Sequence, residues 1–563
     1  MRSFCGLVAL LLLTAPVASA PPDEPRNRLV VLLVFDQMRG DFLARWQDLF
    51  VSNGFRRLTG QGAWFQHCHY PYGYTLTGPG HATVATGCTP DVHGIIANEW
   101  FDRRSGKTAY CAGSDRYTQV PAPEPEKDQK AKVNGVAPDR LLAPTLADAL
   151  KEQLGDRTRV VSLSLKDRSS VLPGGKRPDA VYWADKHGRF VTSTYYRDAV
   201  HDWVKAFNES KVVDRWHGKQ WERLRANIDY NRRVGPDEFR GEGKGNNQGI
   251  VFPHPLDDGP KHQRTNYYAS LANSPFGNEV LLELARKAIV AEKLGQRDAV
   301  DFLNLSFSSN DLIGHTWGPD SQEVLDVTLR SDLIVRDLLE FLDKQVGKGR
   351  YTVVLTADHG ICPLPEVSRS KGLDARRVDL NKIVATAEEF LNKRFPGASE
   401  DPAAPVKKPK WITQQNGMIY LDAGIARRRG TTVEDAAQAL AGWLKTQPGV
   451  GGAMTAADLA QAHPSNEYTH MVRRSYFAGR SGDVMLLPSK YYLLTSNLTG
   501  TTHGSPYGYD THVPLVAYGP TITPGVRTER VSPQLAANIL ARAAGVQPPA
   551  RASQKLPAGL FSR

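Results

Sequence analysis

The sequence predicts an α/β fold, in which a mostly parallel central sheet is flanked by helices as a sandwich. Several short apolar runs are rich in β-branched residues, which is typical of buried parallel strands. Long amphipathic stretches follow some of these runs, so strand and helix alternate along the chain. The 563 residues are 41% hydrophobic and 23% charged, a balance that fits a globular protein with a large core and excludes a disordered or fibrous one.

Five apolar runs are the expected strands of the sheet. They cover residues 28–36, 158–165, 300–307, 351–358 and 512–519. The clearest helices are expected at 321–345 and 279–295, because apolar residues recur there at intervals of three and four.

The first twenty residues have the features of a secretory signal peptide. Arg2 supplies the positive start, a short apolar run follows, and Ala18-Ser19-Ala20 forms a small-residue cleavage site. The apolar run is well short of the roughly 20 residues that a spanning helix needs. We therefore expect a periplasmic or secreted protein with no stable membrane insertion once residues 1–20 are removed.

The rest of the chain is expected to form one core with insertions. The core is assigned to 27–365 and 481–548, with loop insertions near 110–135 and 234–263, where Pro, Gly, Asn or charged residues are dense. Residues 366–480 lie between two core strands and contain a helical stretch at 433–447. They are therefore expected to be an inserted cap or subdomain.

Cysteine usage and charge narrow the function classes. Four cysteines follow the signal segment, at 68, 88, 111 and 362, and both two disulfides and four buried thiols stay open. None lies in a CxxC motif, which argues against a thiolate zinc site. The net charge of +11 is spread without a basic helix or a long Lys/Arg run, so it favours attraction of small phosphorylated anions over specific nucleic-acid binding.

Acidic and basic side chains follow several of the expected strands. The carboxyl ends of strands form the ligand-binding edge of an open α/β sheet. We therefore expect this edge to gather Asp36, Lys166, Arg168, Asp311 and Asp358. A lone Asp after a strand is more often a turn residue or a helix cap, so the coincidence of several is what indicates a site.

Two neighbouring side chains are suited to metal binding. Asp311 and His315 are four residues apart, which puts both on one side of a helical turn, where they can share a cation or a structural hydrogen bond. His359 directly follows Asp358 in a TADHG segment, which is also good turn chemistry.

Thr77 precedes a Gly-rich turn that leads into a helix. Its hydroxyl is either a helix cap or a nucleophile, whose alkoxide the helix amino end and a metal would stabilise. Gly78 and Gly80 are expected to leave room for a phosphate, and His81 is expected to pack beside the site.

These segments resemble the alkaline phosphatase superfamily, in particular the bacterial phosphate-irrepressible alkaline phosphatases with a Thr nucleophile. The resemblance runs through VFDQMRGD, TLTGPGHATVATGCTPDVHGIIANEW, SLKDR, NDLIGHTWGP, TADHG and THGSPYGYDTHVPL, in that order. It extends to the nucleotide pyrophosphatase/phosphodiesterases, which share the metal motifs. An alkaline-phosphatase-like sandwich with two Zn²⁺ per subunit is therefore implied.

The resemblance assigns roles to individual positions. It implies one zinc held by Asp311, His315 and His503, and a second held by Asp36, Asp358 and His359, with the nucleophile Thr77 counted as a further metal ligand. His512 is a rival to His503, but the Gly-rich THGS segment is more similar to the family's ligand position. Thr77 would attack phosphorus to give a phosphothreonine, which zinc-bound water then hydrolyses at alkaline pH.

The preference for phosphate monoesters or diesters depends on which hydrogen-bond donors contact the nonbridging phosphate oxygens. Asn98, Lys166 and Arg168 match the phosphate-contacting residues of the monoesterases, and the diesterase branch is expected to lack the Lys-x-Arg pair. The alternative for the pair is a solvated turn. The resemblance thus implies hydrolysis of small phosphorylated organic monoesters, and we expect a monomer.

Three other functions compete with this interpretation. The nearest is a phosphodiesterase or nucleotide pyrophosphatase of the same superfamily. A sulfatase is disfavoured, because Val92 stands where the modified-cysteine motif that starts at Cys88 would need Arg. A binding protein on a decayed enzyme scaffold predicts a missing nucleophile or ligand, whereas all seven positions are filled.

Overall fold

The computed structural model describes residues 27–123, 134–396, 410–460 and 466–562. The expected signal peptide and residues 124–133 of the expected loop insertion near 110–135 lie outside these ranges. Across the described ranges, no helix is both long and apolar enough to cross a membrane.

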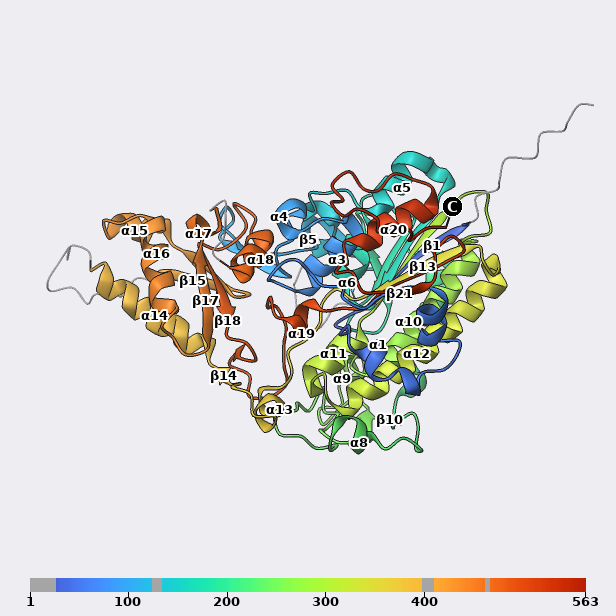
Figure 1. The fold of residues 1–563 in the computed structure, drawn as a ribbon, viewed down its shortest axis with the longest axis horizontal. Coiled ribbons are helices and arrows are strands. Elements are labelled where there is room, and N and C mark those ends of the chain that lie inside the picture. Colours follow the sequence, from blue (N-terminus) through green and yellow to red (C-terminus); the bar gives the residue numbers. More distant parts are fainter. Residues whose placement is uncertain (1–26, 124–133, 397–409, 461–465, 563) are drawn as a thin grey trace, which may run out of the picture.

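An eleven-stranded mixed sheet forms the centre of the molecule (Figure 1). Its spatial order is β21 (Gly525–Arg527), β2 (Ala63–Phe65), β20 (Leu515–Tyr518), β13 (Tyr351–Thr356), β1 (Leu29–Phe35), β12 (Asp301–Phe307), β7 (Val160–Ser164), β8 (Ala180–Ala184), β9 (Phe190–Ser193), β5 (Gly113–Val120) and β6 (Asn134–Val136). The five strands from β13 to β8 are parallel. The α/β fold class is confirmed, with antiparallel pairs added on both sides of this parallel centre.

Helices cover both faces of the sheet, as Figure 1 shows. One layer contains α3 (Thr77–Thr86), α5 (Leu146–Leu154), α6 (Asp167–Gly174) and α20 (Leu535–Ala544). The other contains α10 (Pro275–Ala291) and α12 (Gln322–Leu342), which are the two helices expected from the amphipathic stretches. Because both faces are covered, β1 and β12 are buried at every residue instead of alternating between core and solvent.

The strand register brings the carboxyl ends of the central strands level with one another. Leu29 pairs with Asp301 and Phe35 with Phe307, so β1 and β12 end together. On the other side, Val34 of β1 pairs with Thr356, the last residue of β13. Whatever follows these strands therefore lies at a common edge.

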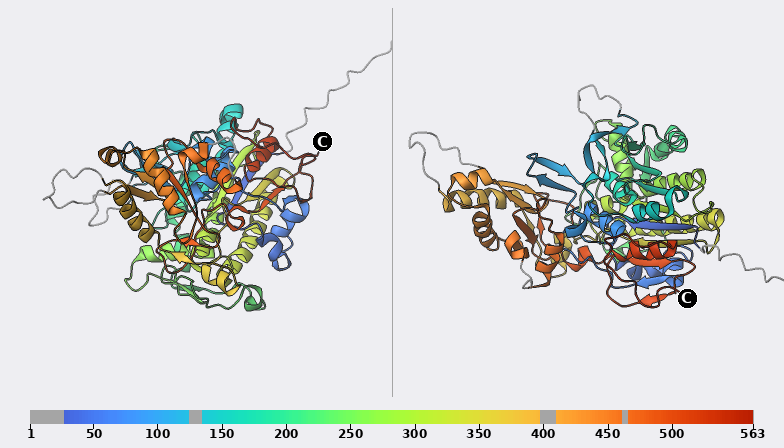
Figure 2. Two further views of the ribbon diagram at one scale, coloured as in Figure 1. Left: turned by 60° about the vertical axis from the view of Figure 1, so that its left-hand side comes forward. Right: turned by 90° about the horizontal axis from the view of Figure 1, so that it is seen from above.

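A smaller lobe stands beside the main sheet in Figure 1 and in the right-hand view of Figure 2. It contains an antiparallel sheet of order β15 (Ile412–Gln415), β16 (Met418–Leu421), β18 (Val484–Pro488) and β17 (Val450–Thr455). The helices α14 (Leu380–Arg394) and α16 (Val433–Leu444) pack on one face. The side chains of β16 alternate, because Ile419 and Leu421 face these helices whereas Met418 and Tyr420 join a second core shared with the main lobe.

Some sequence expectations differ from the structure in detail. The expected strand at 512–519 shortens to β20, which runs antiparallel to β13. In the expected loop at 234–263 the structure has only the short strand β11 (His254–Leu256) and the last turn of α8 (Tyr230–Val234). The helix expected at 433–447 is α16. The predicted domain boundaries stay a prediction, although β18 of the small sheet extends beyond residue 480.

Candidate active site

The residues expected at the sheet edge do lie there, each placed by a different central strand. Asp36 directly follows β1, and Asp358 lies two residues after β13. Asp311 is in the first turn of α11 (Ser309–Trp317), which follows β12, and Lys166 is the N-cap residue of α6, which follows β7. Since β13, β1, β12 and β7 are neighbours, four distant segments meet at one point.

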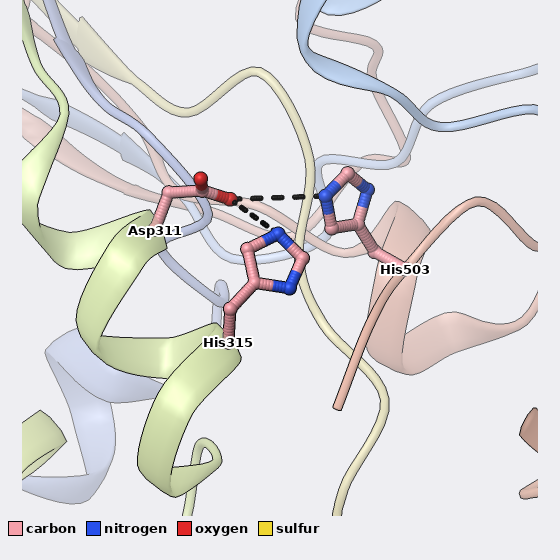
Figure 3. Close-up of side chains that lie close together, drawn as sticks. All are labelled: Asp311, His315 and His503. Atoms are coloured by element: carbon pink, nitrogen blue, oxygen red, sulfur yellow. Dashed lines mark ion pairs between the residues drawn. The ribbon is translucent and has the colours of Figure 1, made fainter. Parts of the chain in front are cut away.

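One group of possible metal ligands consists of Asp311, His315 and His503 (Figure 3). The Asp311 Oδ1 atom is 3.2 Å from His315 Nε2 and 3.7 Å from His503 Nε2. Asp311 and His315 project from the same helix, whereas His503 comes from a loop on the opposite side. The ligand atoms all lie within 4.8 Å of one another, so one cation can contact all three.

A second group lies next to the first and shares a residue with it. Asp36, Asp311 and His359 also bring one ligand atom each within 4.8 Å. His359 Nε2 is 3.5 Å from Asp36 Oδ1 and 3.3 Å from Asp358 Oδ2. Distance alone thus places Asp311 in both groups, whereas the family resemblance assigns Asp358 to the second.

Backbone carbonyls orient all three imidazoles of these groups. The Nδ1 atom of His315 lies 2.7 Å from the Thr501 carbonyl oxygen, and that of His503 lies 2.7 Å from the Thr75 carbonyl oxygen. His359 Nδ1 is 2.9 Å from the Gly360 carbonyl oxygen. Because a carbonyl only accepts, each ring donates from Nδ1 and leaves the Nε2 lone pair directed at the carboxylates, which is the tautomer that a metal ligand needs.

The charges of the site are strongly perturbed by burial. Burial raises the pKa of Asp36 well above its usual range, and the carboxylates of Asp311 and Asp358 add to this effect. Burial also disfavours the charged form of Asp311, but the Lys166 ammonium, followed by His315, outweighs it and holds the pKa of Asp311 well below its usual range. The Lys166 Nζ atom lies 2.7 Å from Asp36 Oδ2 and 2.5 Å from Asp311 Oδ2.

The residues present fit two divalent cations. Asp36 Oδ1 and Asp358 Oδ2 are buried and have no hydrogen-bond partner. Buried carboxylate oxygens without a partner are costly unless a cation neutralises them. Burial, with His359 and His315 nearby, also lowers the pKa of His503 well below its usual range, so its ring is neutral and able to bind metal. The buried Asp and His clusters are consistent with a binuclear metal site.

Thr77 lies against the second group. It is the first residue of α3, and the N-cap position belongs to Leu76, so the Thr77 hydroxyl is not the helix cap. Its Oγ1 atom is 3.3 Å from His359 Nε2. A Cβ at Gly80 would lie 2.1 Å from the Asp358 carbonyl oxygen, so the glycine lets α3 approach the strand end that carries Asp358. The expectation that Gly80 also leaves room for a phosphate stays a prediction.

Asn98 and Arg168, two of the expected phosphate-contacting residues, have different surroundings. The Asn98 Oδ1 atom accepts a hydrogen bond of 2.7 Å from the Gly78 backbone N–H, next to Thr77. Arg168 donates to the Tyr110 hydroxyl at 3.4 Å, and its Nε atom is buried without a hydrogen-bond partner. The hydroxyl of Tyr110 in turn contacts Asp167. Arg168 thus keeps an unused buried donor, as a site for an anion requires.

Two further residues lie against the carboxylates, and one of them, Gln37, has no signal in the sequence. Gln37, at a left-handed φ of 70°, donates from its backbone N–H to Asp358 Oδ1 at 3.1 Å and from Nε2 to Asp311 Oδ1 at 2.6 Å, and it thereby orients both carboxylates. His81 was expected to pack beside the site. Its Nδ1 atom donates to the Thr77 carbonyl oxygen at 2.9 Å and lies 3.2 Å from Asp358 Oδ2.

The rival ligand and the cysteines lie apart from these groups. His512 stacks on His69 with ring centroids 4.6 Å apart, and its Nε2 atom donates to the Gln66 carbonyl oxygen at 2.8 Å. The four described cysteines are buried free thiols, so of the two alternatives left open by the sequence the structure has the buried thiols and not the disulfides.

The α/β sheet, the buried Asp and His clusters and the adjacent hydroxyl are consistent with a hydrolase that has a binuclear metal site. Comparison with known proteins specifies the family. The family described as type I phosphodiesterase / nucleotide pyrophosphatase matches residues 30–510. The chain belongs to this family and, within the alkaline phosphatase superfamily, is an alkaline-phosphatase-like hydrolase of the PafA type.

Three comparisons with known proteins support this assignment. Alkaline phosphatase PhoV of Synechococcus elongatus is 32% identical over 511 residues, covering 90% of this chain and 88% of that protein. Alkaline phosphatase PafA of Elizabethkingia meningoseptica is 32% identical over 501 residues, covering 88% and 87%. A crystal structure of wild-type alkaline phosphatase PafA superimposes with a TM-score of 0.86 at 29% identity, covering 97% of this chain and all of that chain.

Proposed function

We propose that the protein hydrolyses phosphate monoesters with two zinc ions and a covalent phosphothreonine intermediate, releasing inorganic phosphate from small organic phosphates. The observation that carries the proposal is the position of Thr77. Its hydroxyl lies 3.3 Å from His359 Nε2, at the amino end of a helix and beside the two groups of possible ligands. The alkaline phosphatase names of PhoV and PafA support the same activity.

The proposed ligand sets follow the family resemblance. Asp311, His315 and His503 would hold one ion, and Asp36, Asp358 and His359 the other. Bound zinc would supply positive charge that makes a hydroxyl or water more acidic and that offsets negative charge on the reacting oxygens.

The protein's own residues orient and attack the ester. The amino end of α3 and the Asn98 side chain face the phosphate, while Lys166 and Arg168 add positive charge around its nonbridging oxygens. The Thr77 oxygen forms a bond to phosphorus as the ester P–O bond breaks, and the alcohol leaves with a proton. Water then attacks phosphorus, breaks the bond to Thr77 and releases inorganic phosphate.

Preference for monoesters is the testable part of this proposal. A phosphate monoester dianion carries more negative charge on its nonbridging oxygens than a diester does, so the additional positively charged donors Lys166 and Arg168 favour the monoester. We expect p-nitrophenyl phosphate to be preferred over bis-p-nitrophenyl phosphate, and the ratio of the two kcat/KM values to fall at least about tenfold in Arg168→Ala and further in Lys166→Ala/Arg168→Ala. Zinc content is measured in each variant, because Lys166 also contacts Asp36 and Asp311.

Phosphodiester hydrolysis is the second candidate. The matched family's description, type I phosphodiesterase / nucleotide pyrophosphatase, favours it. A wild-type preference for the diester, or a ratio that Arg168→Ala leaves unchanged at full zinc content, would replace the monoester proposal with this one.

The cellular setting is also proposed. The signal-like residues 1–20 support a periplasmic or secreted enzyme, acting as a monomer on small phosphorylated molecules. Cell fractionation and light scattering of the mature protein test these two statements.

A further inference from the structure

A cavity of about 300 Å³ lies between the small lobe and the candidate active site. Its lining includes His503 and Leu76, the residue directly before Thr77. It also includes Gln414, Asn416 and Gly417, at the turn between β15 and β16. The small lobe therefore supplies part of the wall of a space that reaches the proposed ligands.

The geometry of the proposed reaction directs the alcohol portion of the phosphate ester toward this cavity. Phosphoryl transfer places the attacking and leaving oxygens in line on opposite sides of phosphorus. The Thr77 hydroxyl lies at His359, in the second group. The leaving oxygen then faces the first group, and His503 is the member of that group that lines the cavity.

The lining is suited to a ring. Aliphatic side chains of Leu486, Leu493 and Leu494 and the aromatic residues Tyr492 and Tyr509 provide most of the apolar wall. Polar groups make up about as much of the wall, and they include the side chains of Gln414, Asn416, Ser505 and Asp510. Apolar side chains that contact a ring, together with polar groups that fix its orientation, suit an organic ligand that has both a ring and polar substituents.

The walls are held in place before any ligand binds. The Tyr74 hydroxyl lies 3.0 Å from the Gly417 carbonyl oxygen and 2.9 Å from that of Leu486, which ties the segment before Thr77 to two strands of the small sheet. The Tyr507 hydroxyl donates to the Pro488 carbonyl oxygen at 2.9 Å. A preformed cavity lowers the entropy cost of binding the ester group.

A second cavity, of about 270 Å³, is less suited to this role. It is lined by Leu165, Lys166, Phe190 and Tyr268, among others, but by none of the seven proposed ligand and nucleophile residues. The Lys166 Nζ atom is turned to Asp36 and Asp311, so this cavity meets the site only through that side chain.

We propose that the cavity at His503 binds the alcohol portion of the substrate, and that the preferred substrates are phosphate monoesters of ring-bearing alcohols or phenols. This inference rests on the proposed monoesterase function. Aryl phosphates and nucleoside 5′-monophosphates share the required chemistry, and separate substrates distinguish them.

The test fills the cavity with a larger side chain and compares substrates whose alcohol portions differ in size. Gln414→Trp places a large ring in the cavity wall, and Thr413→Trp is the matched control, because Thr413 is the exposed neighbour on the same strand and is absent from the lining. The kcat/KM values are measured for methyl phosphate, phenyl phosphate and adenosine 5′-monophosphate. Each variant is compared with the wild type on the same substrate, so that the intrinsic reactivity of the ester cancels.

We expect Gln414→Trp to lower kcat/KM at least about tenfold for one or both ring-bearing esters and less than about twofold for methyl phosphate, with Thr413→Trp unchanged on all three. A loss confined to phenyl phosphate indicates aryl phosphates as the preferred substrates, and a loss confined to adenosine 5′-monophosphate indicates nucleoside 5′-monophosphates. An equal change on all three esters, or no change, overturns the cavity proposal while leaving the monoesterase function intact. If the wild type hydrolyses no monoester, the proposed function itself fails.

A second variant guards against misfolding of the tryptophan variant. Leu494→Ala enlarges the same cavity, and it is expected to raise KM for the affected ring-bearing ester at least about threefold without changing inhibition by inorganic phosphate. An unchanged KM in a folded Leu494→Ala protein would also contradict the proposal.

Discussion

The Thr77 hydroxyl does not cap a helix, so a substitution of Thr77 tests its role as the nucleophile directly. Leu76 occupies the N-cap position of α3, and among the described residues the contact of Thr77 Oγ1 with His359 Nε2 is the one side-chain hydrogen bond of this hydroxyl. We expect Thr77→Ala to lower kcat for p-nitrophenyl phosphate at least roughly a thousandfold, because the attacking oxygen is removed. Thr77→Ser, which keeps the hydroxyl, should retain much of the rate.

Zinc content and thermal stability serve as controls for both Thr77 variants. Neither should change much, since the proposed ligands remain and the helix cap is untouched. An alanine variant that turns over at a rate close to that of the wild type would exclude Thr77 as the nucleophile.

At the same scale, the carboxylates of the candidate site could be predicted from the sequence, but the residues that hydrogen-bond to the site residues could not. Asp36, Asp311 and Asp358 could be predicted because each follows an apolar run, and the parallel register makes such residues converge. Gln37 and Tyr110 could not, since their roles depend on hydrogen bonds to residues far away in the chain. A Gln after a strand carries no periodicity that distinguishes it from a surface residue.

At the scale of elements, the segment that precedes α3 is fixed by the small lobe. The Ser475 Oγ atom accepts hydrogen bonds of 3.0 Å from the backbone N–H groups of Gly73 and Tyr74. The Tyr74 hydroxyl adds its contacts to β16 and β18 through the carbonyl oxygens of Gly417 and Leu486. Thr77 is therefore held from both lobes.

We expect Tyr74→Phe to lower the free energy of unfolding by about 1–2 kcal/mol, because it leaves a buried carbonyl oxygen without its donor. It should also lower kcat severalfold by loosening the segment that carries Thr77. Urea unfolding and steady-state kinetics measure the two effects. The matched control is Tyr195→Phe, whose hydroxyl donates to the Lys176 carbonyl oxygen in an exposed contact. Equal, near-zero effects in both variants would show that the Tyr74 hydroxyl positions nothing.

Element direction was harder to predict than element type. The central strands β1, β7, β12 and β13 were expected from their continuous apolar runs, which both helical layers make possible. The run that became β20 has the same composition yet pairs antiparallel with β13, because a buried strand has no sequence feature that fixes its direction. The small sheet was missed, since β15 is only four residues long and mostly polar.

At the scale of the whole molecule, two lobes share a hydrophobic core beside the site. Met418 and Met485 of the small sheet pack with Tyr74, Ile95 and Trp100 of the main lobe. This shared core fixes the cavity wall relative to His503. Contacts of this kind join segments more than three hundred residues apart and were beyond sequence reasoning.

Metal removal should affect the whole molecule as well as the reaction. Asp36, Asp311 and Asp358 are all buried at one point, and among the Lys and Arg residues that the structure describes, Lys166 is the one that forms an ion pair with Asp36. A cation that binds only the folded state stabilises it by about 2.7 kcal/mol at a free concentration of roughly 100 times Kd. We therefore expect chelation to lower Tm by several degrees and to abolish hydrolysis, and zinc to restore both.

Ligand stoichiometry makes this prediction specific to the two groups. In His315→Ala the first group loses a ligand, so the bound zinc measured by atomic absorption should fall from about two ions to about one, with the remaining ion held by the second group. His512→Ala is the matched control, because His512 lies apart from both groups and should keep the wild-type zinc content. Loss of both ions in His315→Ala would mean that Asp311 couples the two groups into a single site, as its membership of both already permits. Full retention of zinc would exclude His315 as a ligand.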